Sequence, residues 1–238
     1  TPIQLSAERL RRKYGNVIKE DRETFDRCTD TIIRQVGDVV EMVNAFSQFA
    51  RTPQLQMEEN DIREVVRKAV LDRQEAASEI AYESRLGSEP IMLRCDRRVI
   101  SQAVGNLLKN AQEAIQGFAE SAAREPDWRG RIEAVVRRRG DAVDIEVIDN
   151  GPGLPKHNRN RLLEPYVTTK GSKGTGLGLA IVQKSVEQHG GTLSLEDAPP
   201  GPGRSHGALI RITLPLTRAG DTAPQREEAV AAAATGVA

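Results

Sequence analysis

The sequence predicts an α+β chain in which a helical hairpin is followed by an α/β sandwich. Three observations lead to this prediction. Apolar residues recur every three or four positions between residues 21 and 51, which is the period of a helix packed in a bundle. Beyond residue 61, short strand-like runs separate amphipathic helical stretches, and helices on one face of a mixed sheet form a sandwich. Two glycine clusters, at residues 149–153 and 174–178, mark places where the backbone turns sharply or lies against a ligand.

The first 53 residues are predicted to form the helical hairpin. Residues 1–14 form one helix, Gly15-Asn16 marks the break, and Pro53 ends the second helix. The apolar face of the second helix comprises Phe25, Cys28, Ile32, Val36, Val39, Val43 and Phe46. Two helices cannot bury such faces alone, so we expect residues 1–53 to form a four-helix bundle in a homodimer. The alternative is a hairpin that packs on the second domain of the same chain.

A linker at residues 54–60 leads to the second domain, which is predicted at residues 61–216. Its first helix opens at Asp61, which has capping-box spacing to Glu64. Asp96 caps the next helix, which ends at Gly117. The remaining expected elements are strands at 80–84, 91–95, 192–195 and 208–214, a hairpin of 132–138 with 143–148 closed at Gly140-Asp141, and a helix at 179–189. Residues 217–238 lack an apolar period and are expected to be disordered.

Composition argues against several classes of protein. Lysine plus arginine and aspartate plus glutamate both number 34, so the net charge is zero and no nucleic-acid partner is expected. No signal peptide and no apolar run of about eighteen residues is present, so we expect membrane attachment only through parts outside this chain. Cys28 and Cys95 lack metal-ligand spacing and are expected to be two reduced, buried thiols of a cytosolic protein.

The first glycine cluster follows a predicted strand that ends at Asp149. Gly151 and Gly153 would let the backbone pass close to a ligand beside that carboxylate. The second cluster, Gly174-Thr175-Gly176-Leu177-Gly178, opens a predicted helix, and the unpaired N–H groups at a helix start suit a phosphate. Neither a Walker loop nor a dinucleotide fingerprint is present. The second cluster alone could be a plain turn, so a third element is needed.

Two asparagines supply that third element. Asn106 and Asn110 are four residues apart and share one face of a predicted helix, with Glu113 three residues further on. Apolar residues form the opposite stripe, which would dock on a sheet. A solvated face is the alternative interpretation of the two asparagines. Beside two glycine clusters, however, their amide oxygens suit a Mg²⁺ ion that also holds ATP phosphates.

Four stretches together resemble the sensor histidine kinases of two-component systems. Asn106–Ala114 is similar to their N box, Asp149–Gly153 to their G1 box, Glu164–Lys170 to their F box and Gly174–Gly178 to their G2 box. The order and spacing are those of the family, and the resemblance extends over nearly all of residues 1–216. The first ten residues, TPIQLSAERL, look most like the nitrogen-regulation sensors of the NtrY type. The implied fold of the second domain is that of the histidine-kinase and Hsp90-like ATPases.

The resemblance also implies roles for individual residues. Asp149 would accept a hydrogen bond from the exocyclic amine of adenine, which favours ATP over GTP. Asn106 and Asn110 would bind Mg²⁺, and Gly151 and Gly153 would lie beneath the base. The residues implied near the phosphates are Lys170, Lys173, Gly174, Thr175, Gly176, Leu177 and Gly178. No role is assigned to Glu113, and the lid at residues 154–173 is expected to be mobile without nucleotide.

The implied activity is phosphoryl transfer from ATP to a histidine and then to an aspartate of a response regulator of the NtrX or NtrC type. The implied whole protein is an inner-membrane sensor, of which this chain would be a cytoplasmic portion. The family's acceptor histidine lies in the first helix, but His157, His189 and His206 all lie outside the hairpin. We therefore expect that this chain does not autophosphorylate. The alternatives are an ATPase or protein-serine kinase of the same nucleotide fold, and a nucleotide-gated interaction module.

Overall fold

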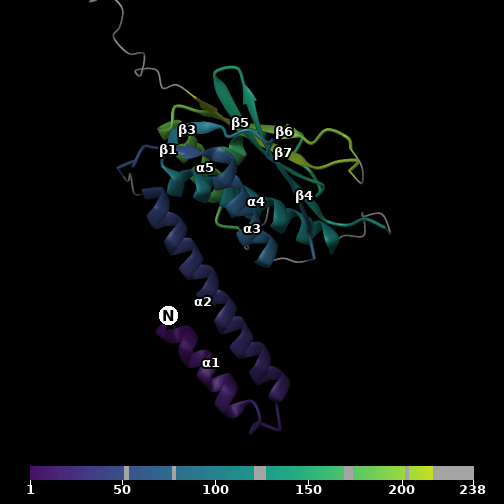
Figure 1. Ribbon diagram of the computed structural model, residues 1–238. Helices are drawn as coiled ribbons and strands as arrows, with labels where there is room; N and C mark the ends of the chain where they lie inside the picture. Colours follow the sequence, from purple (N-terminus) through teal and green to yellow (C-terminus); the bar gives the residue numbers. More distant parts are fainter. Residues whose placement is uncertain (51–53, 77–78, 121–126, 169–173, 202–203, 217–238) are drawn as a thin grey trace, which may run out of the picture. The chain divides into compact units, whose positions relative to one another are not determined.

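Figure 1 shows the structure of the chain as a computed structural model. The structure describes residues 1–50, 54–76, 79–120, 127–168, 174–201 and 204–216. The chain divides into two compact units. The first unit comprises Thr1–Gln54 with Lys156–Ile181, and the second comprises Leu55–Pro155 with Val182–Ala238.

The helices of the predicted hairpin are α1 (Pro2–Tyr14) and α2 (Arg22–Ala50). Thr1 caps α1, because its hydroxyl accepts a hydrogen bond from the backbone N–H of Gln4 at 3.3 Å. The two helices contact each other along the hairpin (Figure 1), and an ion pair joins Arg11 Nη1 to Asp30 Oδ1 at 2.5 Å. Both partners of the pair are more than half exposed, so it stabilises the hairpin by less than about 1 kcal/mol.

Much of the apolar face of α2 is exposed in the single chain. Val39 is 58% exposed, Val43 56% and Phe46 51%. An apolar face of this kind marks an interaction surface, because water contact with it is unfavourable. Cys28 is also exposed, so the expectation that both thiols are buried is wrong for this residue; it lies on α2, much of whose apolar face is exposed. Cys95 is fully buried as expected, and burial raises the pKa of its thiol to about 11.

A five-stranded mixed sheet lies in the second unit, in the order β2-β4-β5-β7-β6. Its strands are β2 (Ala81–Arg85), β4 (Arg131–Arg139), β5 (Ala142–Asp149), β6 (Thr192–Asp197) and β7 (Ala208–Pro215). β2 runs parallel to β4, and the other pairs are antiparallel. The predicted β4–β5 hairpin is confirmed, with Gly140 in its turn at φ +61°.

A separate two-stranded sheet pairs β1 (Glu58–Asp61) with β3 (Met92–Cys95). The sequence does not predict β1, which starts inside the expected linker at residues 54–60. The side chain of Asn60 donates to the backbone oxygens of Glu58 at 2.8 Å and Cys95 at 3.1 Å. The β1 segment is polar and has no apolar alternation, so it is a strand only because it pairs with the distant strand β3.

Helices cover one face of the five-stranded sheet. α3 (Ile62–Ala76) contacts β2 and β4, and α4 (Arg97–Ala119) contacts β4 and β5 (Figure 1). α5 (Gly178–Gln188) buries Val182 and Val186 completely. The buried inward residues of the strands include Ile132, Ala134, Val136, Val143, Ile145, Val147, Ile210, Ile212 and Leu214. The arrangement confirms the predicted α/β sandwich. Among the described helices, none has the apolar length that crossing a bilayer requires.

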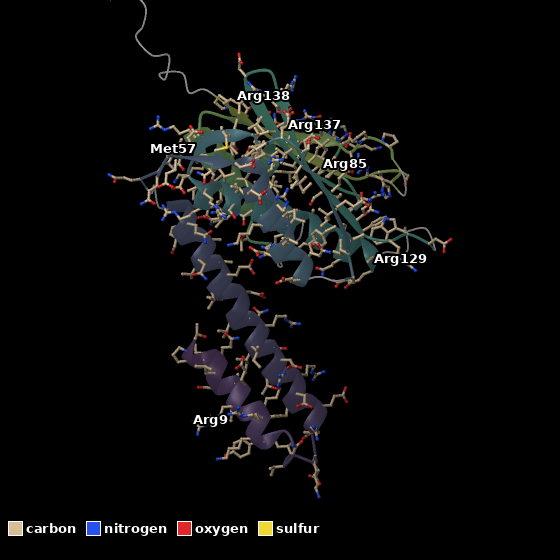
Figure 2. All side chains as sticks on the ribbon, viewed as in Figure 1. Arg9, Met57, Arg85, Arg129, Arg137 and Arg138 are labelled. Atoms are coloured by element: carbon tan, nitrogen blue, oxygen red, sulfur yellow. The ribbon has the colours of Figure 1, made fainter. Side chains whose placement is uncertain are left out.

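Ion pairs cross the opposite face of the sheet. Glu146 on β5 is 4% exposed and accepts from Arg137 Nη2 at 2.7 Å and from Arg211 Nε at 3.0 Å. Arg211 also donates to Glu196 Oε1 at 2.6 Å. Arg137 and Arg138, near the β4–β5 turn, are labelled in Figure 2. The network joins β4, β5, β7 and β6. The same face also carries a small buried apolar cluster of Val135, Ile148, Leu209 and Ala198.

Two buried polar residues join the ends of β3, α4 and α5. Asp96 caps α4 as predicted, because its Oδ1 accepts from the N–H groups of Arg98 at 3.0 Å and Val99 at 3.4 Å. Its own N–H donates to Nε2 of His189 at 3.1 Å, and Nδ1 of His189 lies 2.7 Å from the carbonyl oxygen of Ser185. His189 therefore has the structural role of fixing the end of α5 to the start of α4.

Candidate functional site

Asp149 ends β5 with a buried carboxylate, 5% of the residue being exposed. Its Oδ1 accepts from the N–H of Gly151 at 2.8 Å and from the N–H of Ala208 at 3.3 Å. Within the described part of the chain, no hydrogen bond reaches Oδ2. Burial raises the pKa of Asp149, and the two backbone hydrogen bonds act in the opposite direction. The carboxylate is thus held by one oxygen and offers the other to a ligand.

Three glycines lie around this carboxylate, and two of them, Gly153 and Gly207, have positive φ values that other residues rarely adopt. A Cβ at Gly151 would lie 3.4 Å from the backbone of Ala114, so this loop lies against α4. Gly153 has φ +80°, and a Cβ there would lie 3.2 Å from the carbonyl oxygen of Gly207. Gly207 itself has φ +148°, and a Cβ there would lie only 1.9 Å from the carbonyl oxygen of Asp149. The backbones of Gly153, Gly207 and Asp149 therefore lie in close contact beside the carboxylate.

Gly207 is a site residue that the sequence reasoning missed. It precedes Ala208, whose N–H binds Asp149, so it brings the start of β7 against the end of β5. The sequence offered one sign of this role, which is a glycine at the start of a predicted strand, where it has no side chain to pack. The pairing that gives it a role spans more than fifty residues of sequence, and no local pattern shows it.

Asn106 and Asn110 both lie on the half-buried face of α4. Nδ2 of Asn106 is buried and has no hydrogen-bond partner among the described residues. A buried amide without a partner costs free energy, so its place in a native site calls for a ligand. Glu113 lies one turn beyond Asn110, with its Oε1 3.7 Å from Lys109 Nζ. The orphaned N–H donor suits an acceptor such as a phosphate oxygen, whereas a bound Mg²⁺ would be held by Oδ1 of the same amide.

The second glycine cluster lies in the first unit, and its backbone has one tight contact. The N–H of Tyr166 donates to the carbonyl oxygen of Gly176 at 3.0 Å. Gly176 has φ +64°, and a Cβ there would lie 2.4 Å from the carbonyl carbon of Tyr166. Gly178 begins α5, and the Thr175 hydroxyl accepts from the N–H of Leu177 at 3.3 Å. Gly176 is therefore needed for close packing on Tyr166, whatever ligand the cluster binds.

The structure brings together some of the predicted site residues. In the second unit, Gly151 and Gly153 lie beside the Asp149 carboxylate. The loop that contains them contacts α4, the helix that carries Asn106 and Asn110. Residues Gly174, Thr175, Gly176, Leu177 and Gly178 belong to the first unit. Lys170 and Lys173 lie outside the described residues.

A family model described as "Histidine kinase-, DNA gyrase B-, and HSP90-like ATPase" matches residues 95–218. The matched stretch contains Asn106, Asn110, Asp149 and both glycine clusters. The chain belongs to this ATPase family. The sensor histidine kinase resemblance of the sequence is confirmed, and so is the fold class of the second domain.

The chain is similar in sequence to nitrogen-regulation sensors of the NtrY type. The chain is 52% identical over 217 residues to the nitrogen regulation protein NtrY of Azorhizobium caulinodans, covering 90% of this chain and 26% of that protein. It is 35% identical over 218 residues to a putative NtrY-like sensor histidine kinase of Rickettsia felis, covering 92% of this chain and 34% of that protein. The chain thus spans about a quarter to a third of the length of these relatives.

Solved structures share the fold of the ATPase. The mycobacterial sensor histidine kinase MprB matches with a TM-score of 0.55 and 28% identity, over 66% of this chain and 97% of that chain. Histidine kinase ThkA, solved in complex with the response regulator TrrA, matches with a TM-score of 0.65 and 22% identity, over 91% of this chain and 58% of that chain. The second match includes most of this chain and shows a shared fold.

Proposed function

We propose that this chain binds ATP and Mg²⁺ and acts as the catalytic part of a sensor histidine kinase. The observation that carries the proposal is the buried Asp149 carboxylate, held through Oδ1 and open at Oδ2. A carboxylate can only accept hydrogen bonds when ionised, so it favours the exocyclic amine of adenine over the carbonyl of guanine. Membership of the ATPase family supports the same ligand.

Asn106 and Asn110 are the residues that would hold Mg²⁺. Their amide oxygens are suitable hard ligands, and Nδ2 of Asn106, which has no partner in the described part of the chain, would donate to a phosphate oxygen. When bound, Mg²⁺ supplies positive charge that offsets the charge of the phosphate oxygens. The N–H groups of Gly174, Gly176 and Gly178, with Lys170 and Lys173, are proposed to bind the β- and γ-phosphates.

The proposed reaction is phosphoryl transfer to histidine. A ring nitrogen of the acceptor histidine attacks the γ-phosphorus, the bond from phosphorus to the β–γ bridging oxygen breaks, and ADP leaves. An aspartate of a response regulator then takes the phosphoryl group from the histidine. None of His157, His189 and His206 lies on the hairpin, and His189 is buried with both ring nitrogens in contact. We therefore propose that the acceptor is not one of these three residues.

The proposed partners follow from the hairpin and from the relatives. The exposed apolar face of α2 suits a homodimer through residues 1–53, in which a second copy covers Val39, Val43 and Phe46. The similarity to NtrY supports a role in nitrogen regulation with a response regulator of the NtrX or NtrC type. The proposed setting is the cytoplasmic portion of an inner-membrane sensor.

Incubation with γ-labelled ATP tests this function. The chain is incubated alone and with a histidine-kinase helical segment that carries an acceptor histidine. We expect label on the added segment only, stable to alkali and lost in acid, as phosphohistidine is. ATP binding with release of inorganic phosphate and no labelled protein would favour the ATPase alternative, and binding without any turnover would favour the nucleotide-gated module.

A further inference from the structure

Asn150 follows the Asp149 carboxylate and is almost completely buried, with 2% exposed. Its Oδ1 accepts from the N–H of Arg131 at 2.7 Å, and its Nδ2 donates to the carbonyl oxygen of Arg129 at 2.7 Å. Its backbone N–H also donates to the carbonyl oxygen of Arg131 at 3.3 Å. Its carbonyl oxygen accepts from the indole N–H of Trp128 at 3.1 Å. One residue thus ties the glycine loop to the segment 128–131 through four hydrogen bonds.

The segment 128–131 is in turn fixed to α4. A Cβ at Gly130 would lie 2.5 Å from Cγ2 of Ile115, so the backbone here touches that helix directly. The rings of Trp128 and Phe118 meet edge to face, with centroids 5.3 Å apart. Ile115 and Phe118 are buried residues of α4, the helix that carries Asn106 and Asn110. Figure 2 labels Arg129, whose carbonyl receives the Asn150 amide.

We infer that Asn150 is a positioning residue that sets the distance between Asp149 and α4, and with it the selectivity for adenine. Asn150 lies between Asp149 and Gly151, the residue whose N–H holds Oδ1. When the peptides on both sides of Asn150 are fixed, the carboxylate and its donor are fixed together. The orientation of Oδ2 toward a base amine then depends on the hydrogen bonds of Asn150, a residue that does not itself contact the ligand. This inference rests on the proposed binding of ATP at Asp149.

A nucleotide pair tests the inference. ITP presents a carbonyl oxygen and an N1–H where ATP presents the amine and an unprotonated N1, so the affinity ratio of ATP to ITP reports recognition of this edge of the base, which Asp149 is proposed to contact. Asn150→Ala should lower this ratio roughly tenfold while the affinity for ITP stays nearly unchanged, because only the base contact is misaligned. Loss of stability alone would weaken both nucleotides equally and leave the ratio as it was.

Asn60→Ala is the matched control, because Asn60 also donates to two backbone carbonyls, in the β1–β3 sheet. It should leave the ratio at the wild-type value. Trp128→Phe is the second test variant, because it deletes the N–H that binds Asn150 and keeps an aromatic ring beside Phe118. Trp128→Phe should also lower the ratio of ATP to ITP affinity, but by a smaller factor. It tests the inference even if Asn150→Ala does not fold.

The outcomes separate the inference from the proposed function. A reduced ratio in Asn150→Ala or Trp128→Phe, with a normal ratio in Asn60→Ala, supports the inference. A wild-type ratio in the folded test variants overturns it and leaves ATP binding at Asp149 in place. A wild-type protein that does not prefer ATP over ITP overturns the proposed role of Asp149 itself.

Discussion

Substitution of Gly207 by alanine gives the sharpest test of how the site is built. The added Cβ would lie 1.9 Å from the carbonyl oxygen of Asp149, whereas carbon and oxygen atoms in contact lie about 3.3 Å apart. The end of β5 or the start of β7 must therefore move by more than about 1 Å. The φ of +148° adds strain, because side chains other than glycine rarely adopt it.

The expected magnitude follows from these two effects. An unfavourable backbone conformation costs about 1–3 kcal/mol and overpacking a further 1–3 kcal/mol. The movement also weakens the hydrogen bond from Ala208 N–H to the Asp149 carboxylate. We expect Gly207→Ala to lower the free energy of unfolding by roughly 3 kcal/mol or more and the affinity for ATP by at least about tenfold.

Urea unfolding followed by circular dichroism measures the stability, and calorimetric titration with a non-hydrolysable ATP analogue measures the affinity. Gly117→Ala is the matched control, because it lies in α4 and an added Cβ there would have no described atom within 4 Å apart from the helix's own backbone and its chain neighbours. Since alanine is the better helix former, that variant should equal the wild type or exceed its stability by up to about 1 kcal/mol. An unchanged midpoint and affinity for Gly207→Ala would refute the proposed contact between the two strand ends.

Three further predictions concern the carboxylates and the second glycine cluster. Gly176→Ala should weaken ATP binding in a calorimetric titration, because its Cβ would meet the backbone of Tyr166 at 2.4 Å; unchanged affinity would contradict a phosphate role for the cluster. Asp149→Asn should abolish measurable preference for ATP yet stabilise the fold at pH 7, because burial raises the pKa of Asp149 and its charged form is disfavoured in the folded state. That gain should vanish below about pH 4, where the carboxyl is neutral in both states, and equal urea midpoints at pH 7 would contradict it. Burial acts to raise the pKa of Asp96, but hydrogen bonds, chiefly from Arg98, outweigh it and lower the pKa to about 2. The folded pKa lies below the unfolded value, so Asp96 stabilises the fold above about pH 4, and about 2 kcal/mol is lost as the pH falls toward 2. Asp96→Asn should show a smaller loss over this range in acid unfolding, and an equal loss would argue against the cap.

Local patterns predicted most of the fold. The apolar period marked α2, the Gly140-Asp141 turn marked the β4–β5 hairpin, and Asp96 marked the start of α4. Each of these signals depends on neighbours within about one turn of helix or two residues of strand. The β1 strand carried no such signal, because its partner β3 lies more than thirty residues further along the chain. Cys28 was wrongly expected to be buried, because periodicity identifies an apolar face and not what covers it.

The sequence by itself determined the chemistry of the site: a carboxylate at a strand end, two asparagines on one helix face, and glycines where a backbone must come close. These are properties of residue type and short spacing, and they lie within the stretch that matches the ATPase family. Only the tertiary structure decided how Asp149 is held, through Gly207, Ala208 and the ties of Asn150 to segment 128–131. Those contacts join residues about twenty to sixty positions apart in the chain, and they exist only once the strands have paired. Steric exclusion and hydrogen bonding across such distances leave no periodic signal in a sequence, because they depend on three-dimensional packing alone.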